Sequence, residues 1–74
     1  MTTDTTTTTW RIGQRVSIDT IPDRTLWGIH AGHGGITMEG IGKGYAEFCC
    51  QGCREVLWIA GRWTQRGQIV TYHR

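Results

Sequence analysis

Two pairs of metal-binding side chains constrain this sequence more than anything else in it. His30 and His33 form the first pair, Cys50 and Cys53 the second, and sixteen residues lie between the pairs. A gap of two residues lets both side chains of a tight turn point at one ion, and this separation is typical of two pairs that close on each other. Two imidazoles and two thiolates complete the tetrahedral set that Zn²⁺ prefers. We therefore expect these four residues to bind one structural Zn²⁺ ion.

The chain around these ligands is short for a fold that depends on apolar burial alone. Its 74 residues allow one domain, and the first nine are nearly all threonine, with no apolar side chain after Met1. Such a composition supports neither a core nor a signal peptide or membrane anchor, so we expect residues 1–9 to be a disordered tail. Residues 10–74 then form one domain of a size that commonly depends on a bound metal.

The cysteine count favours metal binding in a reducing compartment. The chain has three cysteines, an odd number that is unusual for a secreted disulfide scaffold. We therefore expect a cytoplasmic protein whose thiolates remain available to a metal. Two alternative ligands stay open from the sequence: Cys49 in place of Cys50 if the turn is one residue longer, and His73 in place of either histidine.

Strand-forming residues dominate the rest of the domain. No window of a dozen residues has a clean helical period, and the apolar residues are rich in Ile, Val, Trp and Tyr. We therefore predict a mainly β fold, a small β-ribbon or small β-barrel stapled by zinc. The expected strands are residues 10–19, 25–29, 36–40, 45–49, 55–60 and 68–72.

Side-chain alternation assigns faces to two of these strands. The apolar face of residues 45–49 continues through Phe48 to Cys50, whereas Cys49 lies on the opposite face. Residues 55–60 are apolar on both faces, which is typical of a central strand covered on both sides, with a short helix as the alternative. We expect the large aromatic side chains to form the core, namely Trp10, Trp27, Phe48, Trp58 and Trp63.

The order of ligand pairs and strands resembles that of a zinc ribbon. The segment His30-Ala-Gly-His33-Gly34 has the spacing and the following glycine of a zinc-ribbon turn, with histidines in place of the usual cysteines. The segment Cys50-Gln-Gly-Cys53 has its glycine before the second ligand. The likeness covers residues 28–60 and implies a module that contacts nucleic acid or protein. Residues 13–19 and 27–29 also resemble the opening of a small SH3-like barrel.

No pattern in the sequence requires an enzyme. A redox role for Cys50 and Cys53 requires a lowered thiolate pKa, often at a helix N-terminus, and no helical pattern follows them. With three ligands on the metal, Glu39 or Glu47 could act as a base on zinc-bound water, but a four-ligand set leaves no position for that water. The chain also lacks a P-loop, a nucleophile elbow and a dinucleotide fingerprint. We therefore expect no enzymatic activity and no small-molecule substrate.

The charge distribution indicates the kind of partner. Residues 54–74 contain four arginines and one glutamate, in a chain whose net charge is only +2. Arginines interleaved with aromatic rings suit phosphate contacts and base stacking, so we expect nucleic acid or a protein of a nucleic-acid machine, and no membrane. The alternatives are a solvated edge above core aromatics, and a protein-interaction module or small regulatory protein, such as a phage encodes, without nucleic-acid contact. The expected contact residues are Lys43, Arg54, Arg62, Trp63, Arg66 and Tyr72.

Overall fold

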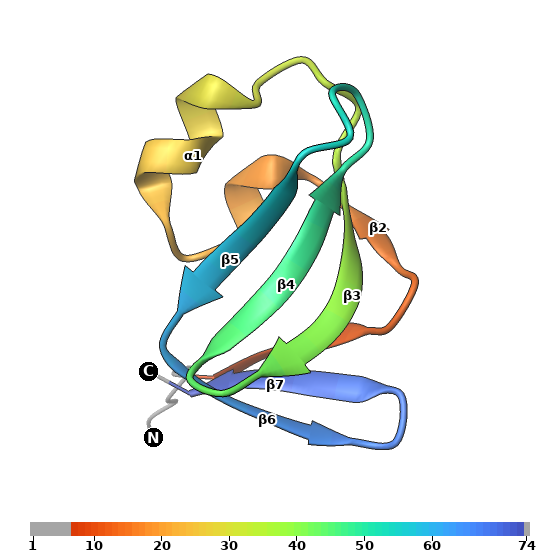
Figure 1. Ribbon diagram of the computed structural model, residues 1–74, viewed down its shortest axis with the longest axis vertical. Coiled ribbons are helices and arrows are strands. Elements are labelled where there is room, and N and C mark those ends of the chain that lie inside the picture. Colours follow the sequence, from red (N-terminus) through yellow and green to blue (C-terminus); the bar gives the residue numbers. More distant parts are fainter. Residues whose placement is uncertain (1–6, 74) are drawn as a thin grey trace, which may run out of the picture.

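Seven β-strands and two short helices make up the described chain. A computed structural model describes residues 7–73, so residues 1–6 and Arg74 lie outside the described part. In chain order the elements are β1 (Thr7–Arg11), β2 (Arg15–Val16), η1 (Ile18–Thr20), α1 (Arg24–Ile29), β3 (Ile36–Gly42), β4 (Tyr45–Cys50), β5 (Val56–Ala60), β6 (Arg62–Arg66) and β7 (Ile69–His73) (Figure 1). The prediction of one small, mainly β domain is confirmed. Within residues 7–73, no helix has the length and apolar composition needed to cross a membrane.

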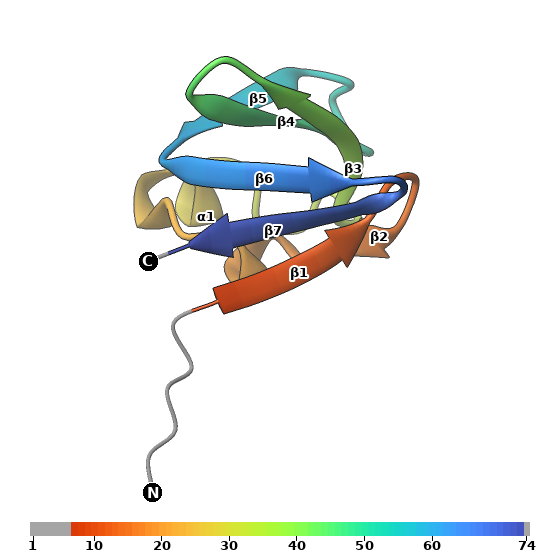
Figure 2. The same cartoon turned by 90° about the horizontal axis from the view of Figure 1, so that it is seen from below.

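The strands form two antiparallel sheets that share two corners. A three-stranded sheet has the order β1-β7-β6, and a four-stranded sheet has the order β2-β3-β4-β5. β1 continues into β2 through residues 12–14, and β5 continues into β6 through Gly61, whose φ of 149° suits a sharp bend. Figure 2 shows β1, β7 and β6 side by side across one end of the β3–β4 hairpin. Because both corners are continuous chain, the two sheets enclose one core as the walls of a small barrel.

Aromatic side chains from both sheets pack together in this core. Trp10 of β1 meets Phe48 of β4 edge to face, with 5.7 Å between ring centroids and 81° between ring planes. Trp63 of β6 lies 5.3 Å from Trp10, and its indole Nε1 donates a hydrogen bond to the carbonyl oxygen of Ile59. Large rings bury much apolar area, and the paired indole nitrogen removes the cost of burying it. The aliphatic residues that complete the core are Ile21, Ile36, Met38, Ala46, Leu57, Ile59 and Val70.

The β3–β4 hairpin forms where the sequence predicts it. Burial alternates along β4, so that Ala46, Phe48 and Cys50 all face the core, as expected. The connecting turn is Lys43-Gly44, and Gly44 adopts a φ of 80°, which residues with a side chain rarely take. The hairpin therefore holds one predicted metal ligand at the buried end of a core strand.

The segment predicted as a second strand, residues 25–29, is helical instead. α1 begins after Asp23, whose side chain accepts a hydrogen bond from the backbone nitrogen of Thr25 at 3.0 Å and so caps the helix. Trp27 donates from Nε1 to the carbonyl oxygen of Ile21 and packs the helix against the core. A helix of six residues is too short to show a helical period, and the β-branched residues within it favour a strand.

The first strand begins earlier and ends sooner than the sequence predicts. β1 pairs residue by residue with β7, so residues 7–9 are strand and the predicted tail boundary is wrong there. Threonine is β-branched and suits a strand. The sequence around residues 7–9 does not reveal this strand, because the strand that pairs with it, β7, lies at the other end of the chain. The strand expected over residues 10–19 breaks at residues 12–14 and ends in β2 and η1. The tail prediction for residues 1–6 lies outside the described residues.

Two predictions for the end of the domain are also wrong. β5 is the edge strand of its sheet and not a central strand, and its side chains alternate between exposed and buried. Trp58, predicted in the core, is 63% exposed, whereas Trp27 and Trp63 pack against the core. The sequence pattern does not predict β6, which is mostly polar and forms because the bend at Gly61 carries the chain across to β7.

Candidate metal centre

The first pair of predicted ligands lies on a turn directly after α1, which we call the His turn (residues 30–33). His30 caps the helix, with its backbone nitrogen donating to the carbonyl oxygen of Leu26 at 3.0 Å. The nitrogen of His33 donates to the carbonyl oxygen of His30 at 3.2 Å, which closes the turn. His30 is 3% exposed, so its imidazole lies inside the protein. Gly34 follows with a φ of 89° that turns the chain towards β3.

The second pair lies on the connection between β4 and β5, which we call the Cys turn (residues 50–53). Cys50 is the last residue of β4 and is fully buried, and its backbone nitrogen donates to the carbonyl oxygen of Glu55 at 2.9 Å. The backbone nitrogen of Gln51 donates to the carbonyl oxygen of Gly35 at 3.0 Å. This last bond joins the Cys turn to the segment that follows the His turn, so the two turns are held side by side.

Two positions show how the turns come together. A Cβ atom at Gly52 would lie 2.6 Å from the Cβ atom and the carbonyl oxygen of His33, so only glycine allows this approach. Arg54, whose backbone nitrogen donates to the carbonyl oxygen of Cys50, has a φ of 65°, in the left-handed region that favours glycine. Gly34 holds the same place after the second histidine as Arg54 holds after the second cysteine. Both turns are therefore followed by a residue with positive φ, although only one has glycine at this place.

One atom from each of the four predicted ligands can approach a common point. These atoms all lie within 4.8 Å of one another. The Sγ atom of Cys50 lies 3.4 Å from Nδ1 of His33, and the Sγ atom of Cys53 lies 3.6 Å from Nδ1 of His30. Tetrahedral bonds of usual length from zinc to sulfur and nitrogen would set such a pair about 3.6 Å apart. The four residues are therefore brought together in a group that could hold a metal ion.

Glu55 lies beside this group and is absent from the sequence-based expectations. Its Oε1 atom is 3.9 Å from Nε2 of His30 and 3.9 Å from Sγ of Cys53. A carboxylate near Nε2 favours the tautomer that carries its proton there and leaves Nδ1 free to bind a metal. Glu55 follows Cys53 by two residues in the sequence. This short separation is the signal from which its position beside the group could have been predicted.

The two thiols of the Cys turn differ in acidity. Burial by itself would raise the pKa of Cys50, but hydrogen bonds from the backbone amides of Cys53 and Gly52 and from the side chains of His33 and Cys53 outweigh it and lower the pKa to about 6. For Cys53 the backbone amide of Glu55 lowers the pKa, while desolvation and the charges of Cys50 and Glu55 raise it, with a net upward shift. A cation between the two sulfur atoms would remove the repulsion between the thiolates.

Neither alternative ligand joins the group. The thiol of Cys49 donates to the carbonyl oxygen of Cys50 at 3.7 Å, and its side chain lies on the face of β4 opposite the core. The Nε2 atom of His73 lies 2.8 Å from the hydroxyl of Thr64, on the three-stranded sheet. The two carboxylates considered as bases, on β3 and β4, lie outside the group as well. All three cysteines of the chain are within the described residues and are free thiols.

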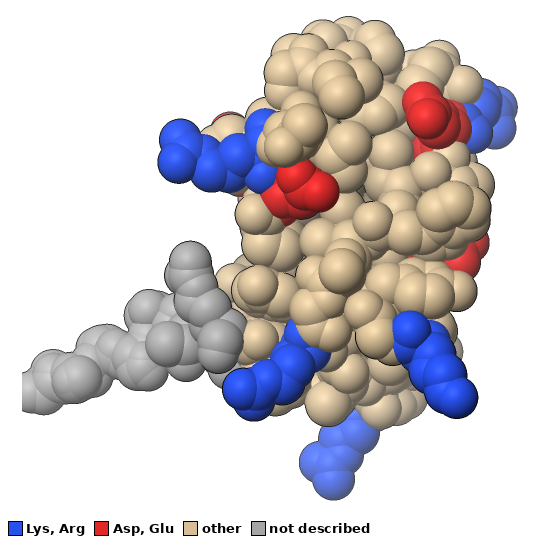
Figure 3. Space-filling view, turned by 60° about the vertical axis from the view of Figure 1, so that its left-hand side comes forward, with Lys and Arg blue, Asp and Glu red and all other residues tan. Residues whose placement is uncertain are grey.

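Three arginines share the outward face of the three-stranded sheet. The register places Arg11, Ile69 and Arg66 in one row across this face, and Arg62 beside His73 in another row. The three strands contain no Asp or Glu, and Figure 3 shows only Lys and Arg among the charged residues at the lower end of the visible side. We call this surface the basic face. Arg11 is not among the expected contacts, because only the pairing of β1 with β7 brings it there.

The other expected contact residues are scattered. Lys43 lies in the β3–β4 turn, where the carbonyl oxygen of Gly44 accepts a hydrogen bond from the backbone nitrogen of Gly61 at the β5–β6 corner. Arg54 directly follows the Cys turn, in the connection between β4 and β5. Trp63 and Tyr72 are half-buried and pack against the core, with 4.9 Å between their ring centroids. The structure thus gathers two of the expected arginines and turns both expected aromatic rings inward.

No family model, no curated protein and no solved structure matches the chain. The geometry of the four ligands and the charges of the basic face are the observations that bear on function.

Proposed function

We propose that this protein is a small nucleic-acid-binding module whose fold is stapled by one Zn²⁺ ion. His30, His33, Cys50 and Cys53 hold the ion, and the basic face contacts the phosphate backbone. The protein acts in the cytoplasm, where thiolates stay reduced, and it is not an enzyme. The single observation that carries the nucleic-acid contact is a sheet face with three exposed arginines on strands that contain no acidic residue.

The ligand chemistry supports zinc over other common ions. Thiolate and imidazole ligands suit Zn²⁺, whereas Mg²⁺ and Ca²⁺ prefer oxygen ligands. Two thiolates balance the charge of a divalent ion when both histidines are neutral. Because four protein ligands fill the tetrahedral positions, the ion has no open position for water and serves the fold.

The spacing of donors on the basic face suits an extended phosphate backbone. Arg11 and Arg66 lie two strands apart, about 10 Å at the usual strand spacing. Arg62 and Arg66 lie four residues apart on β6, about 13 Å along the strand. Guanidinium and hydroxyl groups are frequent donors to phosphate oxygen atoms. Between the arginine rows lies a row of three threonines, Thr9, Thr71 and Thr64.

Binding by such a face is electrostatic and has little selectivity for sequence. Trp63 and Tyr72 pack on the inner side of the sheet, so they support the core and do not stack on bases. Phosphate contacts without base contacts position a nucleic acid but do not read it. The affinity should therefore fall steeply with salt, by about one power of the salt concentration for each phosphate neutralised.

Titration with labelled single- and double-stranded oligonucleotides, in about 50 mM and about 200 mM salt, tests the proposal. We expect Arg11→Ala, Arg62→Ala and Arg66→Ala each to weaken binding to every sequence and to flatten the salt slope by about one unit. Arg15→Ala is the matched control, because it removes an exposed arginine from β2 on the other sheet. Absence of binding at low salt, or an equal effect of the control, would contradict the proposal.

A further inference from the structure

β5 differs from the other edge strands of the two sheets. β1, β2 and β6 each contain at least one arginine, and β2 is only two residues long. Charged residues and short length are the usual protections of a sheet edge against a foreign strand. β5 has no charged residue and carries the exposed apolar side chains of Val56 and Trp58. Among the described sheet edges it is therefore the one most open to an added strand.

The backbone of β5 presents hydrogen-bonding groups at this edge. The backbone nitrogen of Cys50 donates to the carbonyl oxygen of Glu55, and that of Gly61 donates to the carbonyl oxygen of Gly44. The residue pairs at both ends of the ladder between β4 and β5 are therefore hydrogen-bonded pairs. Such pairs alternate with non-bonded pairs along an antiparallel ladder. The residues at positions 56, 58 and 60 therefore turn their N–H and C=O groups away from β4, towards the open edge.

Trp58 is an uncovered aromatic ring beside a carboxylate. Glu47 lies directly opposite Trp58 on β4, in a non-bonded pair, the kind that brings side chains closest together. Tyr45 lies on the same face, with its ring 6.4 Å from that of Trp58 and at 75° to it. Two rings at a wide angle beside a negative charge favour a cation, which is attracted both to the ring faces and to the carboxylate.

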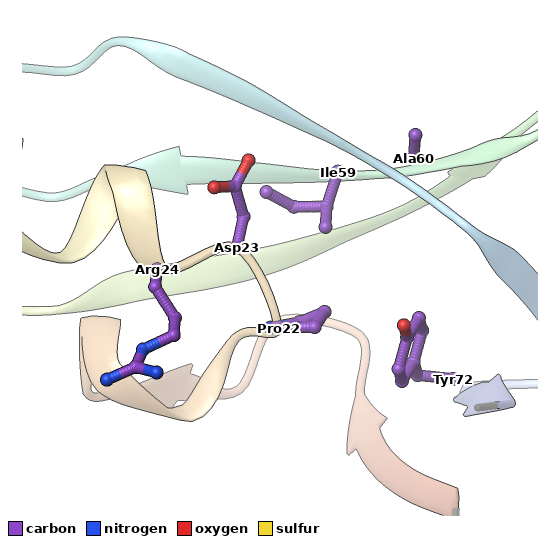
Figure 4. A pocket seen from close by; sticks show the side chains of 6 residues that line it. All are labelled: Pro22, Asp23, Arg24, Ile59, Ala60 and Tyr72. Atoms are coloured by element: carbon purple, nitrogen blue, oxygen red, sulfur yellow. The ribbon is translucent and has the colours of Figure 1, made fainter.

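The edge continues into a hollow with a second carboxylate. A cavity of about 450 Å³ lies beside the end of β5 and is lined by Pro22, Asp23, Arg24, Ile59, Ala60 and Tyr72. In Figure 4 the side chain of Asp23 extends towards the side on which Ile59 lies, whereas that of Arg24 extends away from Ile59. Glu55, with a side chain 64% exposed, precedes the other end of β5. Carboxylates therefore lie at both ends and in the middle of this edge.

We propose that β5 binds an extended, basic segment of a partner protein as an additional strand. The segment pairs its backbone with the outward groups of β5, over about 17 Å or five residues. One arginine or lysine side chain of the segment lies on the ring of Trp58 and reaches the carboxylate of Glu47. Cationic side chains at its ends meet Asp23 and Glu55.

A second copy of this chain does not meet these requirements. β5 contains no basic residue, so two paired β5 strands would leave Trp58 and Glu47 without a cation. The same pairing would bring the carboxylates that flank the two edges towards one another, which is destabilising. The one arginine on the strands of this sheet, Arg15 of β2, lies at the opposite edge. The exposed ring of Trp58 opposite Glu47 therefore assigns the middle of this edge to a basic side chain of a partner.

Fluorescence anisotropy with two labelled synthetic peptides tests this proposal, using the purified full chain. One peptide alternates threonine with arginine and the other alternates threonine with glutamate, and only the first should bind. Trp58→Thr should weaken its binding about tenfold, the factor that a cation on a partly desolvated indole contributes. Val56→Pro removes an outward N–H without touching the β4 ladder and should weaken binding about fivefold. Arg66→Ala, on the basic face, is the control and should leave binding unchanged.

Three outcomes would overturn the proposal. The first is no binding of the arginine peptide at low salt, or equal binding of the two peptides. The second is unchanged affinity in both Trp58→Thr and Val56→Pro, with circular dichroism showing that the variants are folded. The third is a native mass that rises to a dimer with concentration and returns to a monomer in Trp58→Thr, which assigns the edge to a second copy. Arg66→Ala affects the oligonucleotide titration alone, so failure of one proposal is distinguishable from failure of the other.

Discussion

The two ends of this molecule are held together by different means. At the end with α1, the His turn and the Cys turn approach each other, and His30 and Cys50 are their only buried residues. At the other end, where β1, β7 and β6 cross the hairpin, Trp10, Phe48 and Trp63 pack ring against ring. Glycine-rich turns have little apolar surface to bury, so the proposed Zn²⁺ supplies there what packing supplies between the sheets. The two ends should therefore respond differently to chelation and to mutation.

The largest effect is expected at the metal end. Cys50→Ser removes a buried member of the proposed ligand set, and structural zinc contributes on the order of 10 kcal/mol to the folding of small domains. The variant should lose its zinc and, like the chelated wild-type protein, should show no cooperative unfolding transition, as elemental analysis and a thermal melt can measure. Cys49→Ser is the matched control, because the neighbouring thiol lies outside the ligand group. Loss of zinc in Cys49→Ser with retention in Cys50→Ser would move the ligand by one residue.

The aromatic end should lose stability without losing its metal. Phe48 is fully buried between the sheets, and Phe48→Ala should lower the free energy of unfolding by about 3–5 kcal/mol. Urea unfolding should show this loss, while elemental analysis of the folded variant still finds one zinc per chain. If Phe48→Ala also abolished metal binding at temperatures where the variant is folded, the two ends could not be treated as separate.

Shortening β1 measures how much this strand contributes to the stability of the end away from the metal group. Deleting residues 1–9 removes part of a strand paired with β7, and should lower the free energy of unfolding by about 2 kcal/mol through lost backbone hydrogen bonds. The control is deletion of residues 1–6, which leaves β1 whole. Zinc content should be the same in both variants. Equal stability of the two deletions by urea unfolding would show that residues 7–9 do not contribute as a strand.

The smallest expected effect lies in the backbone of the two turns. Arg54 adopts a positive φ, so Arg54→Gly should raise the free energy of unfolding by about 0.5–1 kcal/mol. Gly34 holds the equivalent place after the His turn, and a Cβ atom there meets nothing within 4 Å. Gly34→Ala should therefore lower the free energy of unfolding by about 1–2 kcal/mol through φ strain alone. Thermal melts of the metal-loaded variants measure both, and shifts of the same sign would contradict the account of φ strain at these two places.

The approach of the four side chains that could hold a metal ion was predictable from sequence because each pair is local. Each pair occupies one turn, and alternation along a single strand is enough to choose Cys50 over Cys49. The steric need for Gly52 could not be predicted, because it depends on how closely the His turn approaches. The position of Glu55 beside His30 depends on the same approach of two segments.

The elements around the site were harder to predict, because their structure depends on partners far along the chain. The capped helix α1 is too short to show a period, and a threonine strand is recognisable only beside β7. Trp58 and Trp63 lie on either side of the bend at Gly61. Trp58 is exposed and Trp63 packs against the core, although both are tryptophans in strand-forming segments. Arg11 joins Arg66 on the basic face only through the pairing of three strands.

The most direct test of this account is the zinc content of the purified protein, measured by elemental analysis with native mass and followed by a melt with and without chelator. The account predicts one zinc ion per chain, and a chelator should remove it and abolish the cooperative unfolding transition. A protein that contains no metal, stays folded and keeps the same melting temperature in chelator would contradict it.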